Sequence, residues 1–309
     1  MKHFTLTSQY DALTLHALLI EPSGEPKAVF QLVHGMCEHK ERYIPFMEFM
    51  ASNGYLCVIH DHRGHGESVK SPSDYGYMYS GGAKALVEDV KLVNDYIVQH
   101  YPGKKIFLLG HSMGSMVVRN YVRKYDDNLS GLIVCGSPSY RFGCPFAIVL
   151  VNVMGLFLGM RYKSEFVKKL TFGHYLDHIP DAKSQHSWLC TDDSVVEAYD
   201  ADPLCGFTFS LCGNRSSFLL MWRTYNRLSW NSHFGRKVNA DMPIYFIGGT
   251  EDPCIDGAEN FADAVQTMRN VGYKTVDSRL FPGMRHEILN EKEKQTVWQS
   301  VLDWLEKNR

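Results

Sequence analysis

Short apolar runs alternate with helical patterns along most of this chain, and this alternation constrains the fold more than any other feature. The runs are dense in Val, Ile, Leu and Phe without polar alternation, which is typical of central strands covered on both faces. They cover residues 28–33, 55–60, 106–110, 132–136, 243–249 and 275–281. Alternating stretches near 4–7 and 13–21 predict an opening antiparallel hairpin. The fold class is therefore α/β, with a mostly parallel sheet and helices on both faces.

The alternation stops between residues 139 and 241. This segment is rich in Phe, Leu, Met and Trp, has helical patterns and contains no convincing strand. An insertion between two strands of one sheet predicts a helical cap over the carboxyl ends of the strands, where clefts open in such sheets. We therefore divide the chain into a first core part at 1–138, a cap at 139–241 and a second core part at 242–309.

Charge and cysteine spacing narrow the partners and the compartment. The net charge of -2 and the scattered basic residues predict no nucleic-acid partner. The eight cysteines lack CxxC pairs, and several lie inside apolar runs, so we expect reduced thiols and a cytoplasmic protein. The first twenty residues alternate polar and apolar side chains, which predicts no signal peptide.

The most apolar stretch covers residues 145–160. It is too short and too interrupted for a comfortable bilayer span, so we expect a hydrophobic lid or an interfacial helix instead. Transient contact of the cap with a membrane surface, and a peripheral location at membranes, follow as expectations.

A serine stands where the strand at 106–110 turns into a helix, within the sequence GHSMG. A nucleophile on such a tight turn needs small neighbours two residues before and after it, and Gly110 and Gly114 supply them. The following helix points its free N–H groups at the reacting centre, where negative charge develops. Ser112 is therefore the candidate nucleophile, with helix capping by an ordinary serine as the alternative.

A serine hydroxyl needs a base, and in this architecture the acid and then the base follow at the ends of later strands. His286 is the only histidine after Asp252, which follows the strand at 243–249. We predict that His286 carries the proton and that Asp252 orients its ring. Glu251 and Asp256 are alternatives for the acid, and capping of the last helix is the alternative role for His286.

Two backbone N–H groups should bind the oxyanion. One is that of Met113, the residue after the serine, and the other lies in the loop after the strand at 28–33. Gly35 allows this loop to fold back and leaves the N–H of Met36 as the second donor. His34 is expected to organise the loop through hydrogen bonds.

Clustered histidines in HDHRGH, residues 60–65, raise the alternative of a metal site. In the dinuclear zinc signature H-x-H-x-D-H an aspartate stands where this chain has Gly64, so we favour polar bracing of the loop. The sequence has neither G-x-x-x-x-G-K-[ST] nor G-x-G-x-x-G, and we expect neither a metal nor a cofactor.

Taken together, these features resemble the α/β-hydrolase fold, and within it the monoacylglycerol lipase and lysophospholipase branch of the serine hydrolases, grouped by sequence with the S33 serine aminopeptidases. The resemblance covers nearly the whole chain. It rests on HGMCEHKERY, DHRGHGES, GHSMG, ADPLC, GTEDPC and GMRHEILNE. The chain departs from the family where Cys37 replaces a common glycine and Lys40 replaces a small polar residue.

The resemblance implies the same triad and oxyanion donors, and hydrolysis of fatty-acid esters of monoacylglycerol or lysophospholipid type through an acyl-serine intermediate. An S33-type aminopeptidase and a short-chain carboxylesterase are the enzymatic alternatives. The aminopeptidase needs an anionic group in the cap for a free amine, and Glu165, Asp192, Asp193 and Glu197 are available. A hydrolase-fold module that only binds a ligand is the non-enzymatic alternative.

Overall fold

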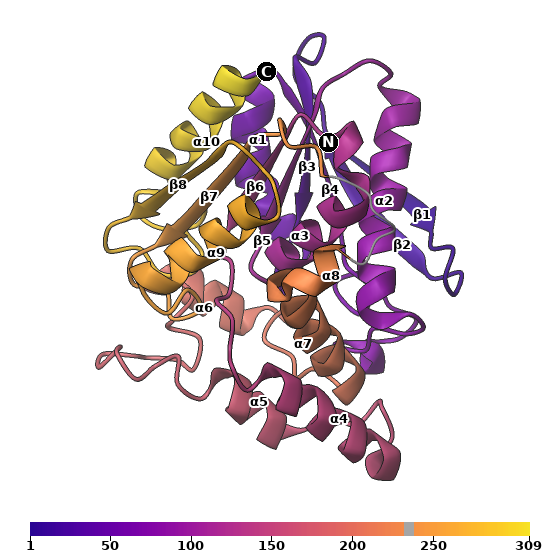
Figure 1. The fold of residues 1–309 in the computed structure, drawn as a ribbon, viewed down its shortest axis with the longest axis vertical. Coiled ribbons are helices and arrows are strands. Elements are labelled where there is room, and N and C mark those ends of the chain that lie inside the picture. Colours follow the sequence, from indigo (N-terminus) through magenta and orange to yellow (C-terminus); the bar gives the residue numbers. More distant parts are fainter. Residues whose placement is uncertain (232–237) are drawn as a thin grey trace.

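An eight-stranded sheet runs through the centre of the computed structural model, which describes residues 1–231 and 238–309 (Figure 1). Its strands are β1 (Lys2–Thr7), β2 (Thr14–Ile20), β3 (Ala28–Val33), β4 (Tyr55–His60), β5 (Ile106–His111), β6 (Gly131–Cys135), β7 (Ile244–Gly249) and β8 (Val276–Phe281). The spatial order is β1-β2-β4-β3-β5-β6-β7-β8. β1 and β2 pair antiparallel with their neighbours and all later strands pair in parallel, as the sequence predicts.

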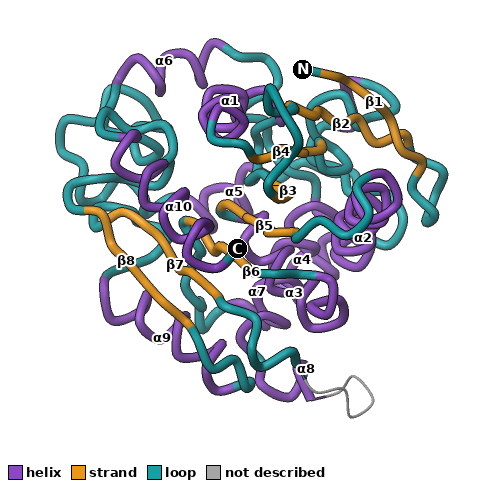
Figure 2. Tube along the Cα trace, turned by 90° about the horizontal axis from the view of Figure 1, so that it is seen from above, coloured by secondary structure: helices purple, strands orange, loops and turns teal. Residues whose placement is uncertain are grey.

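Helices cover both faces of the sheet, and each face has its own apolar core. Helices α2 (Gly82–His100), α3 (Met113–Tyr125) and α9 (Ala258–Asn270) pack on one face. Helices α1 (Ile44–Ser52) and α10 (Lys294–Asn308) pack on the other (Figure 2). This arrangement is the α/β-hydrolase fold that the sequence predicts.

Between β6 and β7, the described residues form five helices. They are α4 (Cys144–Leu158), α5 (Glu165–Phe172), α6 (Asp193–Ala201), α7 (Leu211–Tyr225) and α8 (Arg227–Asn231). α4 packs against α7, and α7 packs against α2 and α3, which anchors this helical layer to the core. In Figure 1, α4, α5 and α7 gather below the sheet. The domain limits at 138/139 and 241/242 remain a prediction.

The strand register brings the candidate site residues to one edge of the sheet. Val33 of β3 lies beside both His60 of β4 and Gly110 of β5, so the loops after these strands begin side by side. His111 lies beside Cys135 of β6 at the same edge. Because parallel strands end together, segments that are far apart in sequence meet here.

Within the described residues, no helix combines the length and the apolar character that crossing a membrane would require. The apolar stretch at 145–160 mostly forms α4.

Candidate active site

Ser112 lies on a strained turn between β5 and α3. Its backbone has φ 53° and ψ −119°, a conformation that residues with a side chain rarely adopt. A Cβ atom at Gly110 would lie 2.4 Å from the carbonyl oxygen of Gly114, and one at Gly114 would lie 2.3 Å from that of Val33. The two glycines are therefore required because backbone atoms leave no room for a side chain, as the GHSMG spacing predicts.

His286 and Asp252 form a buried pair at the ends of β8 and β7. Nδ1 of His286 lies 2.9 Å from Oδ2 of Asp252, and both residues are almost completely buried. A carboxylate can only accept, so Nδ1 carries a hydrogen and Nε2 is available as a base. The other oxygen of Asp252 accepts the backbone N–H of Cys254 at 2.8 Å, which fixes the carboxylate.

The competing acids have other environments. Asp256 pairs with Arg141 at 2.6 Å at the protein surface, and Glu251 is exposed. Asp252 is the carboxylate that contacts the ring of His286.

One cavity of about 350 Å³ collects the remaining candidates. Ser112, His286, Met36, Met113 and Gly35 all line it. Its roof and walls are mostly apolar and come from the cap as well as the core, including Phe172, Tyr175, Leu176, Trp188, Phe207, Phe218 and Met221. The ring of Trp188 lies 5.0 Å from that of His286, so the cap covers the candidate base directly. The structure thus brings every predicted site residue to the lining of a single cavity except Asp252, Gly110 and Gly114. Asp252 contacts the ring of His286, and the two glycines allow the tight turn at Ser112.

The loop after β3 folds back toward Ser112. A Cβ atom at Gly35 would lie 2.6 Å from Oε1 of Glu38 and 3.1 Å from Cβ of Ser112, so a larger residue there would displace these side chains. His34 holds the loop: its Nε2 accepts the N–H of His62 at 2.9 Å, and its Nδ1–H then donates to the carbonyl of Gly35 at 2.8 Å. This is the organising role that the sequence predicts for His34.

A cluster of buried charges at the wall of the cavity was not foreseen from the sequence. Arg42 donates to both oxygens of Glu287 at 2.6 and 2.7 Å and to Glu38 at 2.9 Å. Glu38 also contacts His111, the residue before the serine, at 3.3 Å. These four residues come from the motifs HGMCEHKERY, GHSMG and GMRHEILNE. The sequence signal that they share is a charged or imidazole side chain within a few residues of a proposed catalytic or oxyanion-binding residue.

The two departures from the family pattern occupy different places. Cys37 lines the cavity, and its carbonyl accepts hydrogen bonds from the cap, from Tyr199 Oη at 2.8 Å and from the N–H of Gly206 at 3.1 Å. Lys40 is completely buried and donates to Asp61 at 2.8 Å and to Glu67 at 2.6 Å. Lys40 therefore braces the loop rather than shaping the substrate cavity.

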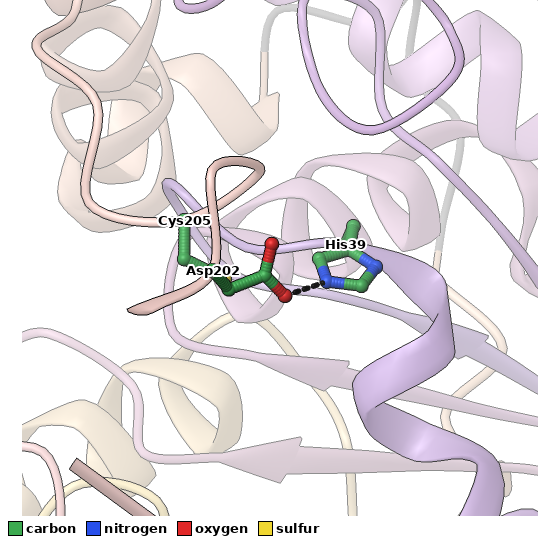
Figure 3. Close-up of side chains that lie close together, drawn as sticks. All are labelled: His39, Asp202 and Cys205. Atoms are coloured by element: carbon green, nitrogen blue, oxygen red, sulfur yellow. Dashed lines mark hydrogen bonds and ion pairs between the residues drawn. The ribbon is translucent and has the colours of Figure 1, made fainter. Parts of the chain in front are cut away.

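Three groups of side chains in the described residues have donor atoms close enough to share a cation, and none of them includes His60, His62 or His65. One group is His39, Asp202 and Cys205, which joins the loop after β3 to the cap (Figure 3). There, Nε2 of His39 lies 2.8 Å from Asp202 and Nδ1 lies 2.7 Å from Glu41. Both nitrogens are therefore occupied by carboxylates, and this arrangement fits a protonated histidine better than a metal ligand.

The HDHRGH histidines pack against one another instead. The rings of His34 and His62 lie 4.5 Å apart, and those of His60 and His62 lie 5.5 Å apart. Burial lowers the pKa of His60 and of His65 to about 4, so these rings are neutral at physiological pH. They fill and brace the space behind the loop after β3.

Comparison with known proteins identifies the family of the chain. The model of the family described as "Serine aminopeptidase, S33" matches residues 24–293. The chain belongs to this hydrolase family. Residues 24–293 include Ser112, Asp252 and His286, together with the whole helical insertion between β6 and β7.

Relatives of this S33 family member include lipases. The monoacylglycerol lipase of Mycolicibacterium smegmatis is 25% identical over 289 residues, which cover 92% of this chain and 90% of that protein. The human monoglyceride lipase is 32% identical over 193 residues, which cover 62% and 57%. Family and relatives together make the chain an ester-cleaving serine hydrolase.

Solved structures share the fold. A carboxyl esterase from Bacillus coagulans, in complex with glycerol, superimposes with a TM-score of 0.90 at 23% identity, covering 99% of this chain and 98% of that one. The monoglyceride lipase from Saccharomyces cerevisiae, in complex with a substrate analog, gives a TM-score of 0.76 at 18% identity, with 99% and 96% covered.

Proposed function

We propose that this protein hydrolyses fatty-acid esters of monoacylglycerol or lysophospholipid type, with Ser112, His286 and Asp252 as its catalytic triad. The observation that carries the proposal is that Ser112 and His286 line one mostly apolar cavity while Asp252 holds the ring of His286 from behind. A hydroxyl, a base and an orienting carboxylate are the groups that acyl transfer requires.

The reaction proceeds in two halves. Oγ of Ser112 attacks the ester carbonyl carbon while Nε2 of His286 takes the hydroxyl proton, and Asp252 stabilises the resulting imidazolium. The tetrahedral intermediate then breaks its bond to the alcohol, which leaves with the proton from His286. Water repeats the sequence on the acyl-serine and releases the fatty acid.

The backbone N–H groups of Met36 and Met113 are the proposed donors to the oxyanion. Both residues line the cavity beside Ser112, and Met113 begins α3, whose N-terminal dipole adds positive potential. One such donor contributes roughly 10² to 10³ in kcat in comparable enzymes.

An acyl chain suits the walls of the cavity. Each buried methylene of a substrate contributes about 0.8 kcal/mol, so a long chain gains affinity from apolar walls alone. The cap supplies much of this wall, including Phe172, Leu176 and Trp188.

The same cap carries an exposed apolar surface on and around α4 and α5. Phe146, Leu156, Phe157 and Phe166 are each more than 60% exposed. An apolar helix face on the outside of a lipid-hydrolase cap suits the boundary between head groups and acyl chains. We infer a transient contact with membrane surfaces, through which substrate enters the cavity.

The aminopeptidase alternative requires a carboxylate for the free amine of a peptide. Of the four acidic candidates in the cap, Glu165 alone lines the cavity, and it accepts a hydrogen bond from Thr208 at 2.8 Å. Lys168 and Lys169 line the cavity beside it. Two ammonium groups in the cavity lining disfavour a cationic substrate, which supports an ester as the substrate.

The proposal can be tested by measuring turnover of three kinds of substrate. These are p-nitrophenyl esters from acetate to palmitate, 2-monooleoylglycerol, and proline β-naphthylamide. We expect turnover of esters with kcat/KM rising with chain length. Highest activity on acetate would indicate a short-chain carboxylesterase, and exclusive turnover of the amide an aminopeptidase.

Active-site labelling separates catalysis from simple binding. A fluorophosphonate should modify Ser112, and Ser112→Ala should lower kcat by at least about 10⁴-fold. Ser73→Ala, at an exposed serine outside the cavity, is the matched control and should retain activity. An absence of adduct on a folded wild-type protein would favour the ligand-binding module.

A further inference from the structure

We propose that His111, as an imidazolium held by Glu38, is a positioning residue that fixes the backbone of His286 relative to Ser112. The inference rests on the proposed triad and adds to it a group that positions the base and transfers no proton. It derives from four buried or nearly buried side chains at the wall of the cavity: Glu38, His111 and Glu287, which line it, and Arg42, which pairs with both carboxylates.

Glu38 is the centre of this cluster. Its Oε1 accepts the N–H of Gly35 at 2.5 Å and the hydroxyl of Tyr43 at 2.9 Å, and its Oε2 accepts Arg42 at 2.9 Å. Burial alone would raise the pKa of Glu38, but its contacts with His111 and Arg42 hold the pKa well below its usual value. Glu38 is therefore a carboxylate, and it acts only as an acceptor.

His111 contacts an acceptor at each ring nitrogen. Nδ1 lies 3.3 Å from Oε1 of Glu38, and Nε2 lies 3.3 Å from the carbonyl oxygen of His286. Neither partner can donate, so both contacts are hydrogen bonds only when both nitrogens carry hydrogens. The doubly protonated, cationic ring is the state that makes both contacts hydrogen bonds.

The charges of the cluster balance in this state. Two carboxylates, Glu38 and Glu287, face two cations, Arg42 and His111, and all four groups are buried or nearly so. A neutral His111 would leave a net negative charge in the interior, which is costly. The titratable and charged groups around the ring are Glu38, Arg42, Tyr43, Cys135, His286 and Glu287.

The cluster connects the three segments that the reaction needs. His111 is covalently attached to Ser112, and its ring lies 4.8 Å from the ring of His286. Through Glu38 it also reaches the N–H of Gly35, one residue before a proposed oxyanion donor. Removal of the hydrogen bonds of His111 should therefore shift the base relative to the hydroxyl. A misplacement of about 1 Å can cost roughly 10²-fold in rate.

The protonation state makes the proposal sensitive to pH. Burial lowers the pKa of His111, but the hydrogen bond and the charge of Glu38 outweigh it and raise the pKa above the usual value. The cationic ring is present at low pH and is lost as the pH rises through this raised pKa. The wild-type enzyme should therefore lose kcat on the alkaline side.

The test uses the full-length protein with His111→Phe, which keeps a ring and removes both N–H groups, Glu38→Gln, and the double variant. All rates are normalised to active sites titrated with a fluorophosphonate, which removes the effect of unfolded protein. We expect each single variant to lower kcat by roughly 10- to 100-fold while KM changes less than about 3-fold. The double variant should be no worse than the worse single one, because the two residues act as one unit.

Asp11→Asn is the matched control. It weakens a separate buried cluster in which Arg63 contacts Asp11 at 2.9 Å and Asp89 at 2.7 Å, and it should lower stability without changing kcat per titrated site. Any of three results would overturn the proposal. The first is a kcat of His111→Phe within about 2-fold of wild type, and the second is a double variant whose loss of kcat equals the combined losses of the single variants. The third is a fall of kcat at high pH that persists in His111→Phe. Loss of activity in Ser112→Ala alongside such results would leave the proposed function standing; full activity in Ser112→Ala would overturn that function instead.

Discussion

Sγ of Cys254 lies 3.9 Å from Nε2 of His286, the nitrogen that must exchange protons with Ser112 in the proposed reaction. Cys254 also lines the cavity, and burial raises the pKa of its thiol well above the usual value. We predict that alkylation by N-ethylmaleimide is slow, quickens with rising pH and inhibits ester turnover, because the adduct occupies the space beside the base. Residual activity against time of exposure measures this.

Cys254→Ala should be active and resistant to the reagent. Cys37→Ala provides the matched control, since Cys37 also lines the cavity but forms no contact with His286. If inhibition persists in Cys254→Ala and disappears in Cys37→Ala, then Cys37 is the thiol responsible and the prediction is wrong.

Gly110 and Gly114, which flank the turn at Ser112, should tolerate no side chain. Gly110→Ala and Gly114→Ala each place a methyl group within 2.4 Å of backbone oxygen, which cannot move aside as a flexible side chain would. We predict a loss of about 1–3 kcal/mol or more in the free energy of unfolding, measured by urea denaturation. Gly24→Ala is the control, because no atom lies within 4 Å of the added methyl, and a comparable loss there would argue against a steric cause.

The fold was predictable because runs of apolar residues and the glycines at their ends can be recognised in short stretches of sequence. All six predicted parallel strands agree with the structure to within one residue at each end. Helix α9 was not expected, although its buried residues Phe261, Ala264, Val265 and Met268 follow the spacing of one helix face. Its mean composition is polar, so its short apolar stripe gives a weaker sequence signal than the apolar strands on either side.

The site was only partly predictable. Ser112, Asp252 and His286 were proposed because each follows a recognisable strand, and the chain order of the acid and the base limits the choice. The contacts of Glu38 with His111 and of Arg42 with Glu287 span 73 and 245 residues of sequence. Nothing local indicates such a pairing, because a charged residue in a loop is most often solvated.

His39 should make the contact between cap and core dependent on pH. Burial lowers the pKa of His39, but hydrogen bonds to Glu41 and Asp202 outweigh it and raise the pKa above its usual value of 6.5. The stabilisation is thus complete below pH 6.5 and is lost as the pH rises through the higher value in the folded protein. We predict that hydrogen-exchange protection of α6 falls over this interval.

Asp202→Asn should lower the protection of α6 at pH 6 and flatten its dependence on pH. The control is Asp200→Asn, which weakens a histidine–carboxylate pair with His186 that lies entirely within the cap. If both substitutions lower the protection of α6 equally, the contact of His39 with Asp202 is not the cause of the pH dependence.

The exposed face of the cap should matter only at lipid surfaces. Leu156→Glu and Phe157→Glu replace side chains that are 82% and 84% exposed, so their effect on stability should stay within about 0.5 kcal/mol. We predict weaker sedimentation with phosphatidylcholine vesicles and slower turnover of monoacylglycerol embedded in them. Hydrolysis of soluble p-nitrophenyl acetate should be unchanged.

Val98→Glu serves as the matched control on α2, outside the cap, where the valine is 43% exposed. Equal losses of vesicle binding in Val98→Glu and Phe157→Glu would contradict a membrane contact through the cap.

The position of β7 and β8 in the sheet has a consequence for synthesis on the ribosome. The turn with Ser112 is translated before its proposed acid and base, because Asp252 and His286 both follow the whole cap in the sequence. The nascent chain therefore carries an unactivated serine until β8 joins the sheet. Reactivity towards lipids should arise only after His286 has been translated and has reached its place beside Asp252.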